Sequence, residues 1–148
     1  MPAQVHYTSF EGISLMTQDL YAQYQQNQLL TASPTKLLLA AYDGAIRFCR
    51  IGLEKMRAEK LEEQSVNINK ALAIVCELLS TLNEQVNPPL VAGLKLLYTY
   101  IIEKLAHANL NQDQDALSEV LGILVNLRET WAEAEKIVQN ETAQREAA

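Results

Sequence analysis

Apolar residues recur along this chain at helical spacing in four stretches. Steps of three and four residues place side chains on one face of a helix, and such steps run through about 34–59, 61–86, 89–109 and 113–140. In the second stretch the steps alternate strictly, which is the seven-residue repeat of helices that pack in bundles. Its members are Ile68, Leu72, Val75, Leu79, Leu82 and Val86. No stretch shows the sustained period-two alternation of a strand, so the pattern predicts four helices.

Proline and asparagine residues mark the ends of these stretches. Ser33 followed by Pro34 is a helix start, because serine accepts a hydrogen bond from the first turn and proline lacks the amide that would stay unpaired. Asn87 precedes two prolines and ends the second helix, and Asn109 suits a left-handed end of the third. Short connections make consecutive helices antiparallel. We therefore expect an all-α, antiparallel up-down four-helix bundle.

The two ends of the chain lack this periodicity. Residues 1–30 mix aromatic and polar residues, so we expect a mobile N-terminal tail with a short helix over about 17–28. Residues 31–140 would form the bundle. Residues 141–148 are polar, and we expect them to be a disordered C-terminal tail.

Composition narrows the class of protein. The chain has 148 residues, of which 49% are hydrophobic, enough for one domain with a sizeable core. Its net charge of −6 argues against a nucleic-acid-binding protein. Cys49 and Cys76 fall in apolar stripes, which favours a reducing compartment over a disulfide scaffold. We expect no signal peptide and no membrane span, since no basic leader and no long apolar run is visible.

The chain offers little material for catalysis. A di-iron bundle needs inward glutamates and paired Glu-x-x-His motifs, whereas the one helical histidine, His107, follows Glu103 on a polar face. Both cysteines are expected to pack in the core, where the thiolate is disfavoured. There is no glycine-rich phosphate loop and no Cys-x-x-Cys motif. We therefore expect neither an enzyme, nor a metal site, nor a cofactor.

The predicted helices carry more apolar residues than a bundle needs. About three of seven positions suffice for a core. The surplus positions are Leu39, Ile46, Leu53, Ile74, Leu78, Leu96, Tyr100 and Ile123. They fit a wider core, a homodimer interface, or a groove for the amphipathic segment of a partner. Gly44 and Gly52 lie inside the first helix, where close approach of a neighbouring helix or peptide would explain them.

Several short motifs, taken in order, resemble the flagellin-specific secretion chaperone family FliS. The resemblance runs from about residue 21 to 134. Its motifs are Tyr21-Ala-Gln, Ala32-Ser33-Pro34 with Leu38, Tyr42-Asp43-Gly44-Ala45, Asn69-Lys70-Ala71 with Ile74, Leu97-Tyr98-x-Tyr100, Leu105-x-x-Ala108-Asn109, Asp113, Glu119 and Trp131. Each motif is weak alone, and their common order and spacing make the resemblance specific.

The resemblance implies a cytoplasmic export chaperone. Such a protein binds the disordered C-terminal segment of flagellin, prevents premature polymerisation and hands flagellin to a membrane protein of the flagellar export gate. It points to Tyr21, and less directly Tyr24, as residues beside the bound flagellin, with Tyr21 also docking on the export gate. Tyr21 could instead act as a hydrophobic staple for the first helix. The alternative function is a structural helical-bundle protein that acts through homodimerisation.

Combining the resemblance with the surplus stripes gives a set of candidate flagellin-binding residues. They are Leu39, Ile46, Leu53, Ile74 and Leu78, with Tyr21 and Tyr24. A segment that folds on binding needs a preformed apolar surface, because the contacts must offset its loss of conformational entropy. Tyr98 and Trp131 are expected to be core residues.

Overall fold

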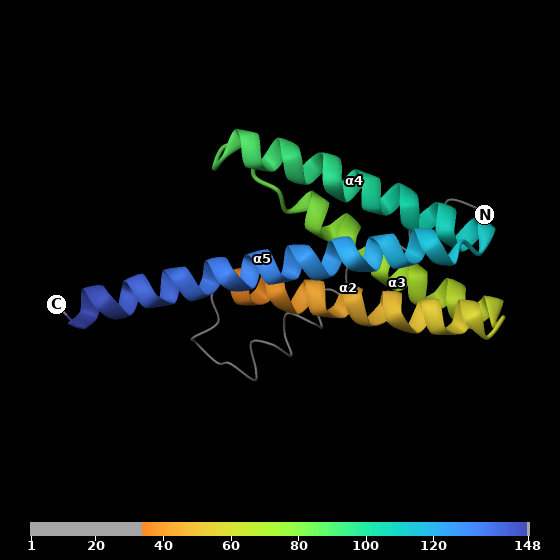
Figure 1. Cartoon of the computed structure of the whole chain (residues 1–148). Coiled ribbons are helices and arrows are strands. Elements are labelled where there is room, and N and C mark those ends of the chain that lie inside the picture. The colour runs from red at the N-terminus through yellow and green to blue at the C-terminus, as the bar shows by residue number, and fades with distance from the viewer. Residues whose placement is uncertain (1–33, 148) are drawn as a thin grey trace, which may run out of the picture.

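A computed structural model describes residues 34–147, which form four helices joined by short turns (Figure 1). They are α2 (Pro34–Arg57), α3 (Leu61–Ser80), α4 (Pro88–Asn111) and α5 (Gln114–Ala147). The predicted all-α four-helix bundle is confirmed. Tyr21, Tyr24 and the rest of the expected N-terminal tail lie outside the described residues.

The helices form a closed ring in which each helix has two neighbours. Helix α2 packs against α3 and α5, and α4 packs against the same two helices. Successive helices run in opposite directions, and α5, the longest, extends past the beginning of α2 (Figure 1). The two short turns, between α2 and α3 and between α4 and α5, therefore lie at the same end of the bundle. No helix within residues 34–147 has the length and apolar character needed to cross a membrane.

Side chains of the connecting residues fix the starts of α4 and α5. The Asn87 side chain accepts a hydrogen bond from the Leu90 amide at 3.3 Å, and prolines occupy the first turn of α4. Asp113 does the same for α5 by accepting from the Ala116 amide at 3.1 Å. That hydrogen bond, together with His107, holds the pKa of Asp113 below its ordinary value. As the sequence suggested, His107 is an exposed histidine near the C-terminal end of α4.

Helix α3 ends at Ser80, earlier than the expected end near Val86. Ser80 and Thr81 donate side-chain hydrogen bonds to carbonyl oxygens of the last turn, which compete with further helical bonds. Asn83 then accepts from the Gln85 amide and forms a turn. The seven-residue repeat continues into the loop, where Leu82 still packs against the core but Val86 is 78% exposed.

Helix α5 continues to Ala147, so the expectation of a disordered tail from residue 141 is wrong for 141–147. These residues are exposed, and most are glutamate, glutamine, alanine or arginine, which favour helix. Adding residues to an existing helix avoids the cost of nucleation. A polar, aperiodic stretch therefore stays helical because a packed helix precedes it.

Helix α4 also runs beyond its expected end at Asn109. The left-handed residue is Gln112, with φ 48°, and its amide donates to the Ala108 carbonyl. The Asn109 side chain instead accepts hydrogen bonds from Ser65 Oγ at 3.0 Å and Gln64 Nε2 at 3.1 Å. Asn109 thus joins α4 to α3, a tertiary role that a local capping rule does not detect.

Two features organise the core between the helices. A Cβ placed on Gly52 would lie 3.0 Å from Ile68 Cγ1, so close contact of α2 with α3 explains this glycine. Across the bundle, Tyr42 and Tyr98 share a hydrogen bond between their hydroxyl groups. Trp131 Nε1 donates to the Tyr42 hydroxyl at 3.2 Å. The tyrosines are buried and Trp131 is half-buried, so the predicted core placement of Tyr98 and Trp131 is confirmed.

Candidate functional site

Four of the predicted flagellin-binding residues lie in the core. Ile46 and Leu53 of α2 are 5% and 7% exposed, and Ile74 and Leu78 of α3 are 0% and 2% exposed. The expectation that they line an open groove is wrong. Each of these helices packs against two neighbours, so its buried face is wider than one seven-residue stripe. Of the interpretations open at the sequence level, a wider core holds for α2 and α3.

Of the remaining predicted flagellin-binding residues, the structure describes only Leu39. Leu39 is partly exposed in the second turn of α2. Tyr21 and Tyr24 lie outside residues 34–147, so their roles at flagellin and at the export gate stay predictions. The structure therefore does not bring the predicted set together into one surface.

The surplus apolar positions of α4 remain at the surface. Leu96 is 76% exposed and Tyr100 is 39% exposed, and they lie one turn apart on the same side of α4. Gly93, one turn before Leu96, is also exposed. Across from them on α5, Ile123 is partly buried. We call the surface formed by Gly93, Leu96, Tyr100 and Ile123 the α4–α5 face.

Polar contacts hold the two sides of this face together. The Tyr100 hydroxyl donates to Glu119 Oε1 at 2.8 Å. Lys104 Nζ lies 3.5 Å from Glu119 Oε2 and 5.7 Å from the Tyr100 ring centre. Leu96 lies one turn before Tyr100 on α4, and Ile123 lies one turn after Glu119 on the antiparallel α5, where it packs against the core. The Tyr100 ring is thereby fixed in an orientation that leaves apolar surface open to solvent.

Gly93 has no side chain, so the backbone of α4 is accessible at this position of the α4–α5 face. An added Cβ would have no atom within 4 Å, so nothing in the described structure requires glycine there. Glycine inside an exposed helix costs about 1 kcal/mol relative to alanine. A partner backbone that approaches α4 closely would explain the residue. Gly93 is not among the positions predicted from the sequence, although its spacing of three and seven from Leu96 and Tyr100 indicates the same side of the helix.

A hollow of about 590 Å³ continues this surface along α5. It is lined by residues that recur every three or four positions, namely Asn126, Glu129, Thr130, Glu133, Ala134 and Ile137. Ile137 is 52% exposed at the far end. From Glu119 to Ile137 the surface follows α5 for roughly 27 Å at 1.5 Å per residue. That length suits a helical segment of several turns.

The opposite side of the bundle is charged. The predicted polar face of α2 is exposed at Asp43, Arg47, Arg50, Glu54 and Arg57. Arg128 Nε donates to Asp43 Oδ1 at 2.8 Å and connects α5 to α2. This pair raises the pKa of Arg128. The interpretation of this charge run as a solvated face is therefore confirmed.

The cysteines offer no activated nucleophile. Burial raises the pKa of the Cys49 thiol to about 12, and burial also raises that of Cys76. A thiol with a raised pKa has little thiolate at neutral pH. Within residues 34–147, no three His, Cys, Asp or Glu side chains gather as metal ligands would.

Comparison with known proteins gives one consistent result. The family model described as flagellar protein FliS matches residues 16–138. The flagellar secretion chaperone FliS of Bacillus subtilis (strain 168) is 34% identical over 117 residues, covering 79% of this chain and 86% of that protein. The protein of the same name from Campylobacter jejuni is 34% identical, with 82% and 93% covered. That of Salmonella typhimurium is 32% identical, with 75% and 84% covered.

Proposed function

The chain belongs to the FliS family of flagellar proteins, and on this premise we propose that it is an export chaperone for flagellin. In this role it binds the disordered C-terminal segment of flagellin, keeps it from polymerising early and delivers it to the flagellar export gate. The protein then works in the cytoplasm as a binding protein and not as an enzyme. Its relatives carry the name flagellar secretion chaperone.

The observation that supports a binding role best is the α4–α5 face. Leu96 is 76% exposed and lies on the same face as the partly exposed Tyr100 and Gly93, which has open space around it. Exposing a large apolar side chain in this way does not stabilise the isolated bundle. Exposed apolar surface of this kind is typical of a site for a partner. We therefore move the proposed flagellin-binding surface from α2 and α3 to α4 and α5.

The shape of this surface fits a segment that becomes helical when it binds. An amphipathic helix presents apolar residues every three or four positions, and the α4–α5 face with the α5 hollow offers partners at the same spacing. Gly93 lets such a helix approach closely. Because the segment loses conformational entropy on ordering, a long contact surface is needed to offset that loss.

Delivery to the export gate needs a second surface that stays accessible when flagellin is bound. We retain Tyr21 as the residue proposed to dock on the gate protein, and Tyr24 as a neighbour of the bound flagellin, on the family resemblance alone. The solvated charged face of α2 lies away from the α4–α5 face and leaves room for such a contact.

The first experiment is calorimetric titration with a synthetic peptide of the host flagellin's C-terminal segment. We expect saturable binding, a negative heat-capacity change and a gain of helical circular dichroism beyond the sum of the two free molecules. These signs together report burial of apolar surface coupled to folding. A titration without heat and without helix gain, on protein shown to be folded, would contradict the proposal.

The variant Leu96→Asp tests where flagellin binds. It places a charge in the middle of the α4–α5 face, and we expect at least about a tenfold loss of affinity with the fold intact, because an exposed site tolerates polar substitution. Val66→Asp is the matched control, since Val66 is also exposed, at 47%, but lies on α3. Equal affinity for both variants and the parent would exclude this face.

The same two variants address homodimerisation, the alternative function. Sedimentation at increasing concentration would show whether the chain associates with itself. A dimer that Leu96→Asp disrupts, combined with no binding of the flagellin peptide, would favour the alternative.

A further inference from the structure

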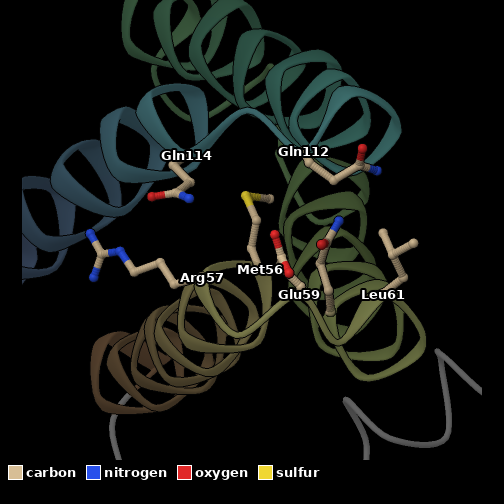
Figure 2. A pocket seen from close by; sticks show the side chains of 7 residues that line it. Met56, Arg57, Glu59, Leu61, Gln112 and Gln114 are labelled. Atoms are coloured by element: carbon tan, nitrogen blue, oxygen red, sulfur yellow. The ribbon is translucent and has the colours of Figure 1, made fainter.

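A pocket of about 390 Å³ lies at the end of the bundle where the two short turns meet, on α2, α3, α5 and the turns between helices. Its lining residues are Met56, Arg57, Glu59, Leu61, Gln64, Gln112 and Gln114. Figure 2 shows Met56 at the centre, with Gln114 and Gln112 on the side of the α4–α5 turn. The α4–α5 face plays no part in this pocket.

One residue that lines the pocket, Gln64, carries a buried acceptor that lacks a donor among the described residues. Gln64 is 0% exposed, and its Nε2 donates to Asn109 O at 3.3 Å and Asn109 Oδ1 at 3.1 Å. These two acceptors fix which end of the amide is nitrogen. Gln64 Oε1 is then left buried without a hydrogen-bond partner among the described residues. Leaving such an atom unpaired is costly, so a donor that enters the pocket would be favoured.

A carboxylate side chain, that of Glu59, lines the same pocket. Glu59 has a left-handed backbone, with φ 59°, and Figure 2 shows its side chain between Met56 and the start of α3. Its carboxylate forms no ion pair within residues 34–147. Arg57, the one cation among the described residues that line the pocket, extends in Figure 2 away from Met56 and Glu59. Two residues with oxygen acceptors, Gln64 and Glu59, thus line a pocket to which Met56 and Leu61 contribute apolar side chains.

We propose that this pocket binds a primary alkylammonium group, with the ammonium between Gln64 Oε1 and the Glu59 carboxylate and the methylene chain against Met56 and Leu61. An ammonium has three donors and no acceptor, which matches two acceptors that have no partner among residues 34–147. A lysine side chain of a polypeptide and a free polyamine both have this chemistry. The net charge of −6 favours the approach of either.

Entry requires a small local movement. Gln64 Oε1 has no contact with solvent, so an entering ammonium must displace a neighbouring side chain. Glu59 is exposed and can rotate without disturbing the core. The same rotation brings its carboxylate to the cation.

The test is a nuclear magnetic resonance titration of the full-length protein with three probes. They are the peptide acetyl-Gly-Lys-Gly-amide, its norleucine counterpart and the diamine cadaverine. We expect saturable shifts of the Gln64 side-chain amide and the Glu59 backbone amide with lysine peptide or cadaverine, and at least about tenfold weaker binding of the norleucine peptide. If the lysine peptide binds more tightly than cadaverine, the natural ligand is a lysine side chain of a polypeptide. If cadaverine binds more tightly, the natural ligand is a free amine. No saturable shift, or equal binding of the norleucine peptide, would overturn the proposal.

Three variants locate the site. Gln64→Met removes the acceptor while Asn109 O keeps the Gln112 donor and Asn109 Oδ1 keeps Ser65. Glu59→Gln removes the charge at an exposed position, so it serves if Gln64→Met fails to fold. Both should weaken amine binding at least about fivefold. Gln85→Met, at an exposed position between α3 and α4 and outside the pocket, is the matched control and should bind like the parent. Parent-like binding by folded Gln64→Met and Glu59→Gln would refute the assignment.

Discussion

At the scale of single residues, Tyr42 is the polar centre of an otherwise apolar core. Its hydroxyl accepts from Trp131 of α5 and shares a hydrogen bond with Tyr98 of α4, so one oxygen links three helices. Burial raises the pKa of Tyr42, although both hydrogen bonds act in the opposite direction. The hydroxyl therefore stays neutral at physiological pH, the form in which it can both donate and accept.

Tyr42→Phe should lower the free energy of unfolding by about 1–3 kcal/mol, since the half-buried indole N–H of Trp131 loses its acceptor. Urea denaturation followed by circular dichroism measures this change. Tyr100→Phe removes a hydroxyl at the surface and should change stability by no more than about 0.5 kcal/mol. Similar losses in the two variants would mean that the buried hydrogen bonds add nothing to stability.

At the scale of helices, two glycines that each lie inside a helix and precede a leucine have opposite explanations. Gly52 of α2 is where Ile68 of α3 comes closest, so its missing side chain serves packing within the bundle. Gly93 of α4 has open space around it. Gly52 therefore allows close packing of α2 on α3. Gly93 makes α4 less stable, but it leaves the backbone of α4 accessible at the surface.

Alanine at these two positions should change stability in opposite directions. Gly93→Ala gains helix propensity without a clash, and we expect a gain of about 1 kcal/mol. Gly52→Ala gains the same propensity but forces Ile68 to move, and overpacking costs about 1–3 kcal/mol, so a net loss is expected. Urea denaturation of both variants provides the check. Stabilisation by both would show that α2 and α3 can separate slightly at no cost.

The sequence predicted the positions of the helices well, but it predicted poorly which of their apolar residues are buried by neighbouring helices. Periodicity located all four helices, because a packed helix must bury one side regardless of its neighbours. It could not tell which surplus residues are buried. Ile74 and Leu96 look alike in sequence, yet α3 has α2 packed against it where α4 faces solvent. Local rules also failed at Asn109, whose side chain serves a tertiary contact instead of a helix end.

At the scale of the whole molecule, α5 differs from its neighbours in length. It has 34 residues, whereas α2 and α4 each have 24. The ion pair of Arg128 with Asp43 sets the register, so the part of α5 after about residue 138 passes the start of α2. This projecting part has no described helix beside it, and Figure 1 shows it leaving the bundle.

A chain that ends at residue 140 should keep the stability of the bundle. The removed residues are exposed, so the midpoint of thermal unfolding should move by no more than about 2 °C. The helical circular dichroism signal should fall by more than removal of a disordered tail would cause, because 141–147 are helical. A large drop in the midpoint would show that the projecting part packs on something else.

Trp131 is the single tryptophan of the chain, and its position makes it an optical probe that requires no labelling. Its indole is half-buried and hydrogen-bonded to Tyr42, on the same turn of α5 as the hollow residues Thr130 and Ala134. Emission excited at a wavelength selective for indole would therefore respond to two events, loss of the core on unfolding and coverage of the hollow by a partner. Unfolding moves the emission to longer wavelength, whereas coverage shields the indole from soluble quenchers. The fluorescence of Trp131 can thus distinguish unfolding from partner binding in one sample of the unlabelled protein.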